Sequence, residues 1–332
     1  IIFIDEIDAI GKNRTENRTG GTSNEDILNA LLTEMDGFKT NASKPVFVLA
    51  ATNFAVEEGR GQRTLDPALV RRFDRKIFVE LPSRAERETY IRRKNDADNA
   101  LCLTEDKIQN IAVRSTGMSL AEIENAIELS FRNAIRMNSV VVTDEIFEDA
   151  FESFNSGRVK KWDEASLKRT ARHESGHALV CWKGGEMPSY LTIVARDNHG
   201  GYMQHGDQEG KGVYTRQEIL QRIRVAMGGR AAEMVYYGEN GYTSGALQTA
   251  TRLARLLLGS YGMDEEFGLA AVESGEFTQE MRERVNEILQ KELEEAVKII
   301  ESNRQKLDDL TEALLDKNHL TDKEMGKILE EK

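Results

Sequence analysis

The fold of this chain is restricted most by its hydrophobic pattern, which changes period near residue 82. Before that point, short Val/Ile/Leu/Phe runs at 1–4, 46–51 and 76–81 alternate with a helical pattern at 26–35. Short apolar runs separated by helices predict the buried strands of a parallel sheet that helices cover. The first part of the chain is therefore expected to be an α/β domain.

After residue 82 the strand pattern gives way to amphipathic helices. Ile123, Ile127 and Phe131 fall on one stripe of such a helix and predict a core-facing surface. A further helical part follows the basic joint at 157–161, with one strand-like insert at 191–195 and 202–204. The fold class predicted is multidomain, with a parallel α/β sheet followed by all-α parts.

Two or three domains, and at least two, are expected from the length, because a single core rarely grows beyond roughly 250 to 300 residues and the chain has 332; the change of pattern divides the chain into three. The boundaries predicted are 1–82, 83–158 and 159–332. Residues 278–332 read as two charged helices split near Lys317. The Gly-, Thr- and Asn-rich stretch 11–24 reads as a mobile loop.

Composition excludes some classes of protein. The net charge of −12 repels phosphate backbones, so nucleic acid is not expected as a partner. Cys102 and Cys181 form neither a disulfide framework nor a CxxC pair, and we expect two packing thiols. No apolar run of roughly 18 residues is present, so this sequence predicts no membrane span. Its abrupt start in a strand pattern at Ile1 is typical of a fragment.

Two carboxylates follow the first apolar run, as in a Walker B strand. Asp5 would organise Mg²⁺ through its waters, and Glu6 would orient the water that attacks a nucleotide phosphate. Taken alone the match is weak, since a strand ending in Asp-Glu is more often the start of a loop.

The next motifs strengthen that interpretation. A second apolar run ends in Asn53, and the stretch 65–75 contains Arg72 and Arg75. This succession resembles the AAA ATPases. The resemblance implies Asn53 as a sensor of the γ-phosphate, and Arg72 and Arg75 as fingers that reach a neighbouring subunit's nucleotide. The alternative is surface arginines paired with Asp74 or Glu80.

The sequence departs from the AAA pattern in two ways. Family members usually have Pro-Gly between the two arginines that here stand together as Arg71 and Arg72, which puts the finger geometry in doubt. No GxxxxGK[ST] loop is present to hold the β and γ phosphates. ATP hydrolysis is therefore expected to need a missing N-terminal part that supplies this loop and the family's pore-loop aromatic residue.

A second motif, His173-Glu174-Ser175-Gly176-His177, is an HExxH sequence in a helix predicted over 164–182. Residues at i and i+4 lie one above the other on a helix, so both imidazoles can bind one metal ion. Glu174 would then act as the general base on a water molecule. The sequence predicts zinc bound by His173 and His177, although short HExxH strings also occur on the surface helices of unrelated proteins.

The surroundings of this motif resemble the FtsH family of ATP-driven zinc proteases. The stretches 171–180 and 228–237 look like signature segments of FtsH peptidase domains, and the resemblance covers essentially the whole chain. It implies a partial AAA domain at 1–82, a helical AAA lid domain at 83–158 and a zinc metallopeptidase domain at 159–332. It also implies a hexameric ring, ATP and Mg²⁺ in the full-length protein, protein or peptide substrates, and a membrane anchor outside this cytoplasmic fragment.

The third zinc ligand is missing from its expected place. In the FtsH family it is the aspartate of a Gly-Ala-x-x-Asp-Leu stretch, whereas here Ala246 is followed directly by Leu247. Either three residues are absent from the sequence as given, or this variant has lost the ligand. Glu233 is the best substitute, although a helix-pairing or orienting role fits it better. Glu239 and Asp264 are weaker candidates.

Two further histidines flank a predicted edge strand. His199 and His205 stand on either side of 200–202, which we expect to hold a substrate backbone by β-addition. As ordinary loop imidazoles, they are not expected to bind metal. The function predicted is an ATP-dependent zinc endopeptidase, and the alternative is a degenerate unfoldase or ring scaffold with an inactive zinc site.

Overall fold

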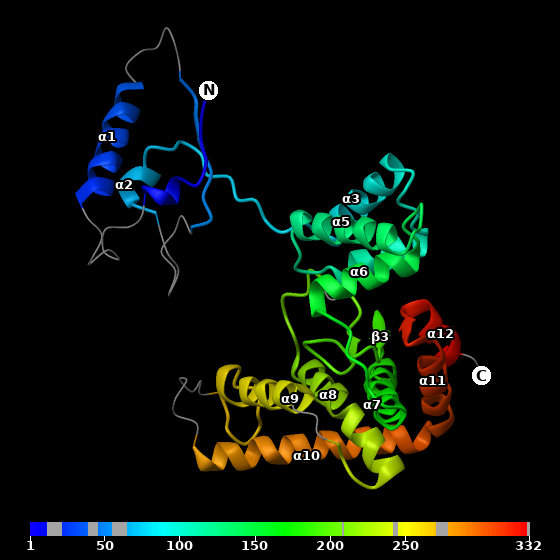
Figure 1. Ribbon diagram of the computed structural model, residues 1–332. Coiled ribbons are helices and arrows are strands. Elements are labelled where there is room, and N and C mark those ends of the chain that lie inside the picture. The colour runs from blue at the N-terminus through cyan, green and yellow to red at the C-terminus, as the bar shows by residue number, and fades with distance from the viewer. Residues whose placement is uncertain are drawn as a thin grey trace. The chain divides into compact units, whose positions relative to one another are not determined.

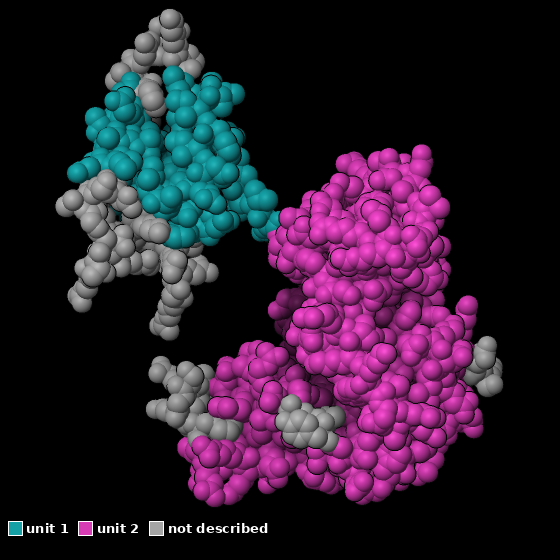
Figure 2. All heavy atoms as spheres, in the orientation of Figure 1, with its two compact units in different colours: residues 1–80 teal, residues 81–332 magenta. Residues whose placement is uncertain are grey.

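The computed structural model divides the chain into two compact units, Ile1–Glu80 and Leu81–Lys332 (Figures 1 and 2). No helix among the described residues is long and apolar enough to cross a bilayer. The residues that the structure describes are 1–11, 22–38, 46–54, 65–207, 209–241, 245–269 and 278–330.

The first unit contains the predicted parallel strand pair. Strand β1 (Ile2–Ile4) pairs with β2 (Val48–Ala50), and helices α1 (Thr22–Phe38) and α2 (Pro67–Val70) belong to the same unit (Figure 1). Asp66 caps α2, because its carboxylate accepts the backbone N–H groups of the first turn. The parallel α/β class predicted for this part is thus confirmed. Its small core is formed by Ile7, Leu28, Met35, Leu65 and Leu69.

Two details of the first unit differ from the prediction. Residues 76–81 do not form a strand: no strand pairs with them in the part of the unit that the structure describes, and Val79 is 94% exposed. Strand β1 was expected to be buried, yet Phe3 is 59% exposed, because β2 is the one strand that pairs with it among the described residues. The predicted loop 11–24 lies mostly outside the described residues, and its last residues belong to α1.

Residues 83–157 are helical, as predicted. Ser83 and Ser119 each begin a helix with a capping box, in which the serine and a glutamate three residues later satisfy each other's backbone N–H groups. Ile123 and Ile127 lie in the core and Phe131 packs against it. The four helices are α3 (Arg84–Ala97), α4 (Glu105–Arg114), α5 (Leu120–Arg136) and α6 (Asp144–Ser156).

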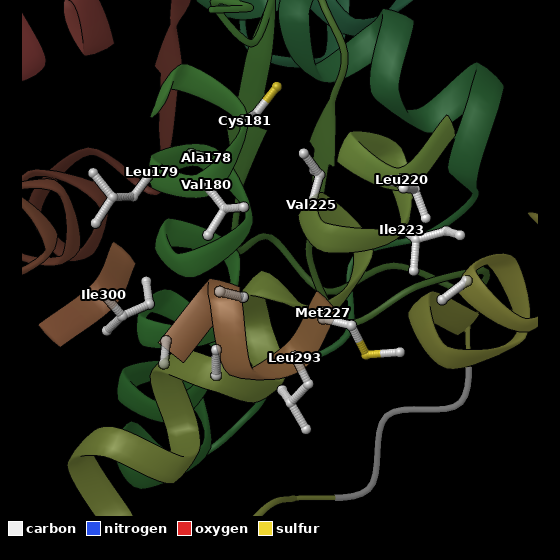
Figure 3. Packing of buried hydrophobic residues seen from close by; sticks show 14 of the residues in the cluster. Ala178, Leu179, Val180, Cys181, Leu220, Ile223, Val225, Met227, Leu293 and Ile300 are labelled. Carbon is white, nitrogen blue, oxygen red and sulfur yellow. The ribbon is translucent and has the colours of Figure 1, made fainter. Parts of the chain in front are cut away.

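The remaining residues build a third core around two long helices, α7 (Glu164–Lys183) and α8 (Arg216–Tyr237). Aliphatic side chains of α7, α8 and α10 meet in this core (Figure 3). A three-stranded antiparallel sheet in the order β4-β3-β5 completes this part. Its strands are β3 (Tyr190–Thr192), β4 (Tyr202–Gln204) and β5 (His319–Thr321), and the other helices are α9 (Gly245–Arg255), α10 (Gln279–Ser302), α11 (Arg304–Lys317) and α12 (Asp322–Glu330).

The prediction of two C-terminal helices was wrong. Residues 278–330 form three helices and the strand β5. Asn303 leaves the helical conformation between α10 and α11, and Asn318 takes a left-handed conformation (φ 65°) that ends α11. The chain then turns back so that β5 pairs with β3, a long-range pairing that has no local sequence signal.

A buried ionic cluster joins the helices of 83–157 to this sheet. The Arg114 guanidinium lies 3.5 Å from the centre of the Tyr190 ring, 2.8 Å from the Glu148 carboxylate and beside Glu152. Burial acts to raise the pKa of Glu148, but Arg114 and Lys107 outweigh it and hold this pKa well below its usual range. Glu148 is therefore an ionised carboxylate that depends on its cationic neighbours.

Helices α7 and α8 approach each other closely at two glycines. A Cβ added to Gly176 would lie 2.4 Å from the Gly228 carbonyl oxygen, and one added to Gly228 would lie 2.6 Å from the Gly176 carbonyl oxygen. Since both neighbours are backbone atoms, they cannot move away as a flexible side chain would. Glycine at these positions therefore sets the distance between the two helices.

Gly228→Ala is expected to lower the free energy of unfolding by about 1–3 kcal/mol, because the added methyl overpacks this contact. The clash opposes the gain in helix propensity of about 1 kcal/mol that alanine brings. Urea unfolding followed by circular dichroism measures the difference. Gly212→Ala is the matched control, since a Cβ there meets nothing within 4 Å, and its effect is expected to stay within about 0.5 kcal/mol. Equal effects of the two substitutions would contradict this account of the contact.

Glu148→Gln is expected to destabilise the second unit by about 3 kcal/mol at pH 7, because Arg114 and Lys107 lose their buried carboxylate. The folded-state pKa of Glu148 lies below its ordinary value of 4.5. Its contribution to stability is therefore present above pH 4.5 and is lost as the pH falls further. The difference in unfolding free energy between wild type and variant should become smaller as the pH falls from 5 to 3. Denaturant titrations at each pH measure this difference. Glu128→Gln, at an exposed i,i+4 pair, serves as the control, and a gap that is independent of pH would contradict the prediction.

Candidate functional site

The middle of α7 carries His173, Glu174 and His177 on buried positions. Asp163 caps the N-terminus of the helix, and the predicted helix over 164–182 is confirmed. The two histidines are 6% and 7% exposed, and their Nε2 atoms lie 3.1 Å apart. Their rings meet edge to face, with an angle of 79° between the planes. The i,i+4 spacing thus brings two imidazole nitrogens to one point.

The other ring nitrogen of each histidine faces a hydrogen-bond acceptor. The Nδ1 of His177 lies 2.6 Å from the Val225 carbonyl oxygen, and the Nδ1 of His173 lies 2.7 Å from Glu233 Oε1. A carbonyl or carboxylate oxygen can only accept, so each Nδ1 carries a proton. At His177 the 2.6 Å contact with Val225 outweighs the longer 3.3 Å contact with the backbone N–H of Gly229. Burial, with His173 acting in the same direction, lowers the pKa of His177 to about 3 and keeps it neutral. Two Nε2 lone pairs facing each other fit a shared cation such as Zn²⁺.

Glu233 on α8 orients His173 from outside the metal position. Its Oε2 accepts the Nε–H of Arg169 at 2.7 Å and the backbone N–H of Gly241 at 2.6 Å. Burial acts to raise the pKa of Glu233, but the hydrogen bonds from His173, Gly241 and Arg169 lower it to about 2. Because Glu233 contacts the Nδ1 that faces away from His177, the geometry favours the orienting role over that of a third ligand.

Glu174 lies beside the start of the edge strand β4. A Cβ added to Gly201 would lie 2.8 Å from the Thr192 carbonyl oxygen and 3.2 Å from the Glu174 Cγ, so glycine lets the start of β4 lie close to β3 and to Glu174. Burial raises the pKa of Glu174 to about 7, although His173 acts in the opposite direction. A carboxylate whose pKa lies near neutrality is suited to take up and release a proton.

The signature stretch at 228–237 also serves the histidine pair. A Cβ on Gly229 would lie 2.4 Å from the His173 Nε2, so this glycine leaves space for the imidazole. Gly228 allows the helices to approach and Glu233 holds the ring, so one stretch of α8 supplies three parts of the site. The sequence singled out this stretch by resemblance, but only the structure shows what each residue does.

No third ligand joins the histidine pair among the described residues. The missing aspartate falls between Ala246 and Leu247, in the first turn of α9, and the sequence of α9 contains no carboxylate. Glu239 is an exposed residue that pairs with Arg169, and Asp264 is a buried residue held by Arg284 at 3.2 Å. The residues present therefore fit two ligands and a base, and the third protein position of a tetrahedral catalytic ion, next to the position for water, has no protein ligand.

The two loop histidines, His199 and His205, have contacts of their own, separate from those of His173 and His177. The His199 ring meets Tyr202 edge to face. The Nδ1 of His205 lies 2.9 Å from Glu186 Oε1 and 3.9 Å from Cys181 Sγ. In the part of the chain that the structure describes, Cys181, Glu186 and His205 are the one group of three His, Cys, Asp or Glu side chains whose ligand atoms all lie within 4.8 Å of one another. Their spacing in the sequence gave no signal of this group.

In the first unit, the parallel register of β1 and β2 brings the predicted nucleotide residues to one edge. Ile4 pairs with Ala50, so Asp5 and Glu6 leave the sheet on the same side as Asn53. All three side chains are exposed. Glu6 has a left-handed backbone (φ 47°), which is uncommon outside glycine and is often found at functional sites.

The predicted arginine fingers differ in their surroundings. Arg72 forms two contacts of 2.7 Å with the Asp36 carboxylate on α1, so its partner is neither Asp74 nor Glu80. Arg75 is exposed in the extended segment that follows α2. Their roles toward a nucleotide of a neighbouring subunit stay predictions.

Comparison with known proteins agrees with this division of the chain. The model of the ATPase family associated with various cellular activities (AAA) matches residues 1–81, and that of Peptidase family M41 matches residues 160–328. The class defined by the fold and the site is a metallopeptidase preceded by part of an AAA domain. The chain belongs to peptidase family M41, a family of zinc metalloproteases.

The curated relatives that match are named ATP-dependent zinc metalloproteases. The ATP-dependent zinc metalloprotease FtsH of Mycoplasma mobile is 33% identical over 358 aligned residues, which cover 99% of this chain and 49% of that protein. The FtsH of Neorickettsia risticii is 34% identical, with 100% of this chain and 54% of that protein covered. Clostridium perfringens FtsH is 34% identical, with 99% of this chain and 48% of that protein covered. The chain spans about half the length of the curated relatives it matches.

Glu233→Gln is expected to weaken zinc binding about 10- to 100-fold, because a neutral amide holds the Nδ1–H of His173 less firmly than a carboxylate does. Competition with a fluorescent zinc chelator measures the affinity. Glu239→Gln is the control, since this exposed carboxylate contacts Arg169 but not His173. The orienting role would be refuted by an unchanged affinity in a Glu233→Gln protein that retains its helical content.

Proposed function

We propose that this chain is the proteolytic part of an ATP-dependent zinc endopeptidase. The observation that carries the proposal is the pair of buried imidazoles with facing Nε2 atoms, 3.1 Å apart, next to a buried carboxylate on the same helix. Family membership and the FtsH relatives support the same reaction class.

His173 and His177 would hold the Zn²⁺ through their Nε2 atoms. When bound, Zn²⁺ supplies Lewis-acid chemistry, because it lowers the pKa of a water ligand to about 7 and polarises a carbonyl group. Glu233 and the Val225 carbonyl fix the ring orientations. Glu174 accepts the proton of the attacking water on its carboxylate and returns it to the amide nitrogen that leaves.

Strand β4 would position the peptide. It is an outer strand of the sheet β4-β3-β5, and its N-terminal end adjoins Glu174 at Gly201. An extended substrate that pairs with the free edge of β4 would place a peptide bond near the carboxylate. Such recognition uses backbone groups and demands an unfolded substrate, in agreement with a protease driven by ATP.

The AAA part suggests how substrates reach this site. Asp5, Glu6 and Asn53 gather at one edge of the parallel pair, where Mg²⁺ and the nucleotide phosphates would lie. Arg72 and Arg75 would act on the nucleotide of a neighbouring subunit, so a homo-oligomeric ring, a hexamer by resemblance, is part of the proposal. The phosphate-binding loop and any membrane attachment would come from sequence outside this chain.

The absent aspartate favours a second candidate. A protein with the same ring and AAA part but an incomplete zinc site would act as an unfoldase or scaffold and cleave nothing. The first turn of α9, where Ala246 meets Leu247 without an intervening carboxylate, is the specific observation behind it. The two candidates differ in metal retention and in cleavage.

Glu174→Gln tests the general base. The substitution keeps the shape of the side chain but removes the proton acceptor, so cleavage of an unfolded, fluorescently labelled casein should fall at least 100-fold. Zinc content, measured by atomic emission, should stay unchanged because Glu174 is not a ligand in the proposal. Casein cleavage that survives the substitution at the wild-type rate would refute it.

Insertion of Ser-Gly-Asp between Ala246 and Leu247 separates the two candidates. If the given chain lacks its third ligand, the insertion should raise zinc affinity and casein cleavage at least tenfold, because a carboxylate completes the tetrahedral set. Ser-Gly-Asn is the matched control, since it restores the loop length without the charge. Equal behaviour of both insertions would exclude a missing ligand as the cause of low activity.

A further inference from the structure

A second cluster of metal-binding side chains lies at the end of α7, one turn beyond His177. The Sγ of Cys181, the Nδ1 of His205 and an oxygen of Glu186 all lie within 4.8 Å of one another. The shortest separation is 2.9 Å, between His205 Nδ1 and Glu186 Oε1, and the sulfur lies 3.9 Å from the same nitrogen. Neither His173 nor His177 takes part in this group.

The end of α7 folds so that Glu186 returns toward Cys181. The backbone N–H of Glu186 donates to the Cys181 carbonyl at 3.3 Å, and that of Gly185 donates to the Trp182 carbonyl at 2.9 Å. This pair of bonds is a Schellman motif, and Gly185 supplies its left-handed residue with φ 88°. The relation of Cys181 to Glu186 is therefore fixed by the helix end itself.

The third residue is brought in by the sheet. His205 follows β4 directly, and its carbonyl accepts the hydroxyl of Ser189, which precedes β3, at 2.7 Å. A Cβ added to Gly206 would lie 2.6 Å from the Met187 carbonyl oxygen. Glycine at 206 thus lets the end of β4 approach the turn that follows α7. Helix, turn and strand hold the three donors together by backbone contacts that need no metal.

We propose that Cys181, Glu186 and His205 form a second zinc site, distinct from the histidine pair. Thiolate, imidazole and carboxylate are the three side-chain types that bind Zn²⁺ in proteins. The separations are close to those in a tetrahedral set, so small side-chain rotations suffice. Binding of the metal would release the thiol proton of Cys181 to solvent and leave the imidazole proton of His205 on Nε2, and a water molecule would take the fourth position.

Charge and exposure agree with this site. Cys181 is 1% exposed, whereas the side chains of Glu186 and His205 are 26% and 35% exposed, so an ion can enter from the solvent side. A thiolate and a carboxylate together neutralise Zn²⁺. In Figure 3 Cys181 stands at the end of its helix, beside the aliphatic cluster. Burial, with the Glu186 charge acting in the same direction, holds the pKa of the Cys181 thiol well above its usual range, and the Arg222 charge opposes this only in part.

A metal at this site would hold the C-terminal end of α7 next to the end of β4. Both elements also contribute to the candidate peptidase site, α7 through its ligands and base and β4 through the proposed substrate edge. A metal at this point would stabilise their relative position without touching the substrate. The three ligand atoms do not include those of the histidine pair, so this site can form whether or not the peptidase site is complete.

Cobalt substitution tests the proposal on the whole chain. After chelator treatment, titration with Co²⁺ should produce a near-ultraviolet charge-transfer band from a thiolate ligand, reaching its plateau at one equivalent for this site. The histidine pair cannot produce this band, because neither of its ligands contains sulfur. Cys181→Ser should abolish the band, and Cys102→Ser, at the exposed cysteine, should leave it unchanged.

Three further variants test whether the band comes from this site and not from the histidine pair. His205→Gln and Glu186→Gln, at partly exposed positions, should weaken Co²⁺ binding at this site at least tenfold and leave the circular dichroism spectrum unchanged. His173→Ala should retain the band, which distinguishes this site from the proposed catalytic metal. The proposal is overturned if wild type gives no thiolate band with excess Co²⁺, or if the band persists in Cys181→Ser. A band that disappears in Cys102→Ser would also overturn it.

Discussion

The close contact of α7 and α8 at Gly176 and Gly228 is the constraint on which the rest of the peptidase part depends. At this contact the backbone of one helix touches the backbone of the other, so no side chain separates them. The same face of α8 then presents Val225, Gly229 and Glu233 at intervals of one turn toward the histidines of α7. A wider separation would remove both acceptors from the Nδ1 atoms. The packing of α7 against α8 therefore also fixes the orientation of the two histidine rings.

A second constraint connects this site with the helices that precede it in the chain. Arg114 on α4 is buried between the Tyr190 ring of β3 and the carboxylates of α6, and Tyr202 of β4 donates its hydroxyl to Glu152 at 2.7 Å. The strand proposed to hold the substrate is thus linked by hydrogen bonds to the helices of residues 83–157. A buried ionic cluster is specific in its geometry, because each charge requires its partners.

Prediction from sequence succeeded where a pattern is local. The HExxH spacing and the apolar stripe of α5 depend on neighbours within a few turns, and the helices α7 and α5 followed from them. The parallel pair of β1 and β2 followed from short apolar runs that alternate with helices. It failed where the outcome depends on a distant partner. Residues 76–81 have strand composition but pair with no strand in the described part of their unit, and β5 forms only because β3 lies beside it.

The sequence by itself determined the kind of chemistry: two histidines and a glutamate one helical turn apart, the residues of a partial nucleotide site, and the absence of an aspartate before Leu247. Only the tertiary structure decided the role of Glu233, the need for glycine at 228 and 229, and the meeting of Cys181 with Glu186 and His205. The physical reason is that helical periodicity fixes which residues share a face, whereas distances between elements are set by packing. Those distances decide whether a carboxylate such as Glu233 binds the metal or orients a histidine, and whether the Cys181 thiol meets other metal-binding side chains. No single stretch of the sequence contains them.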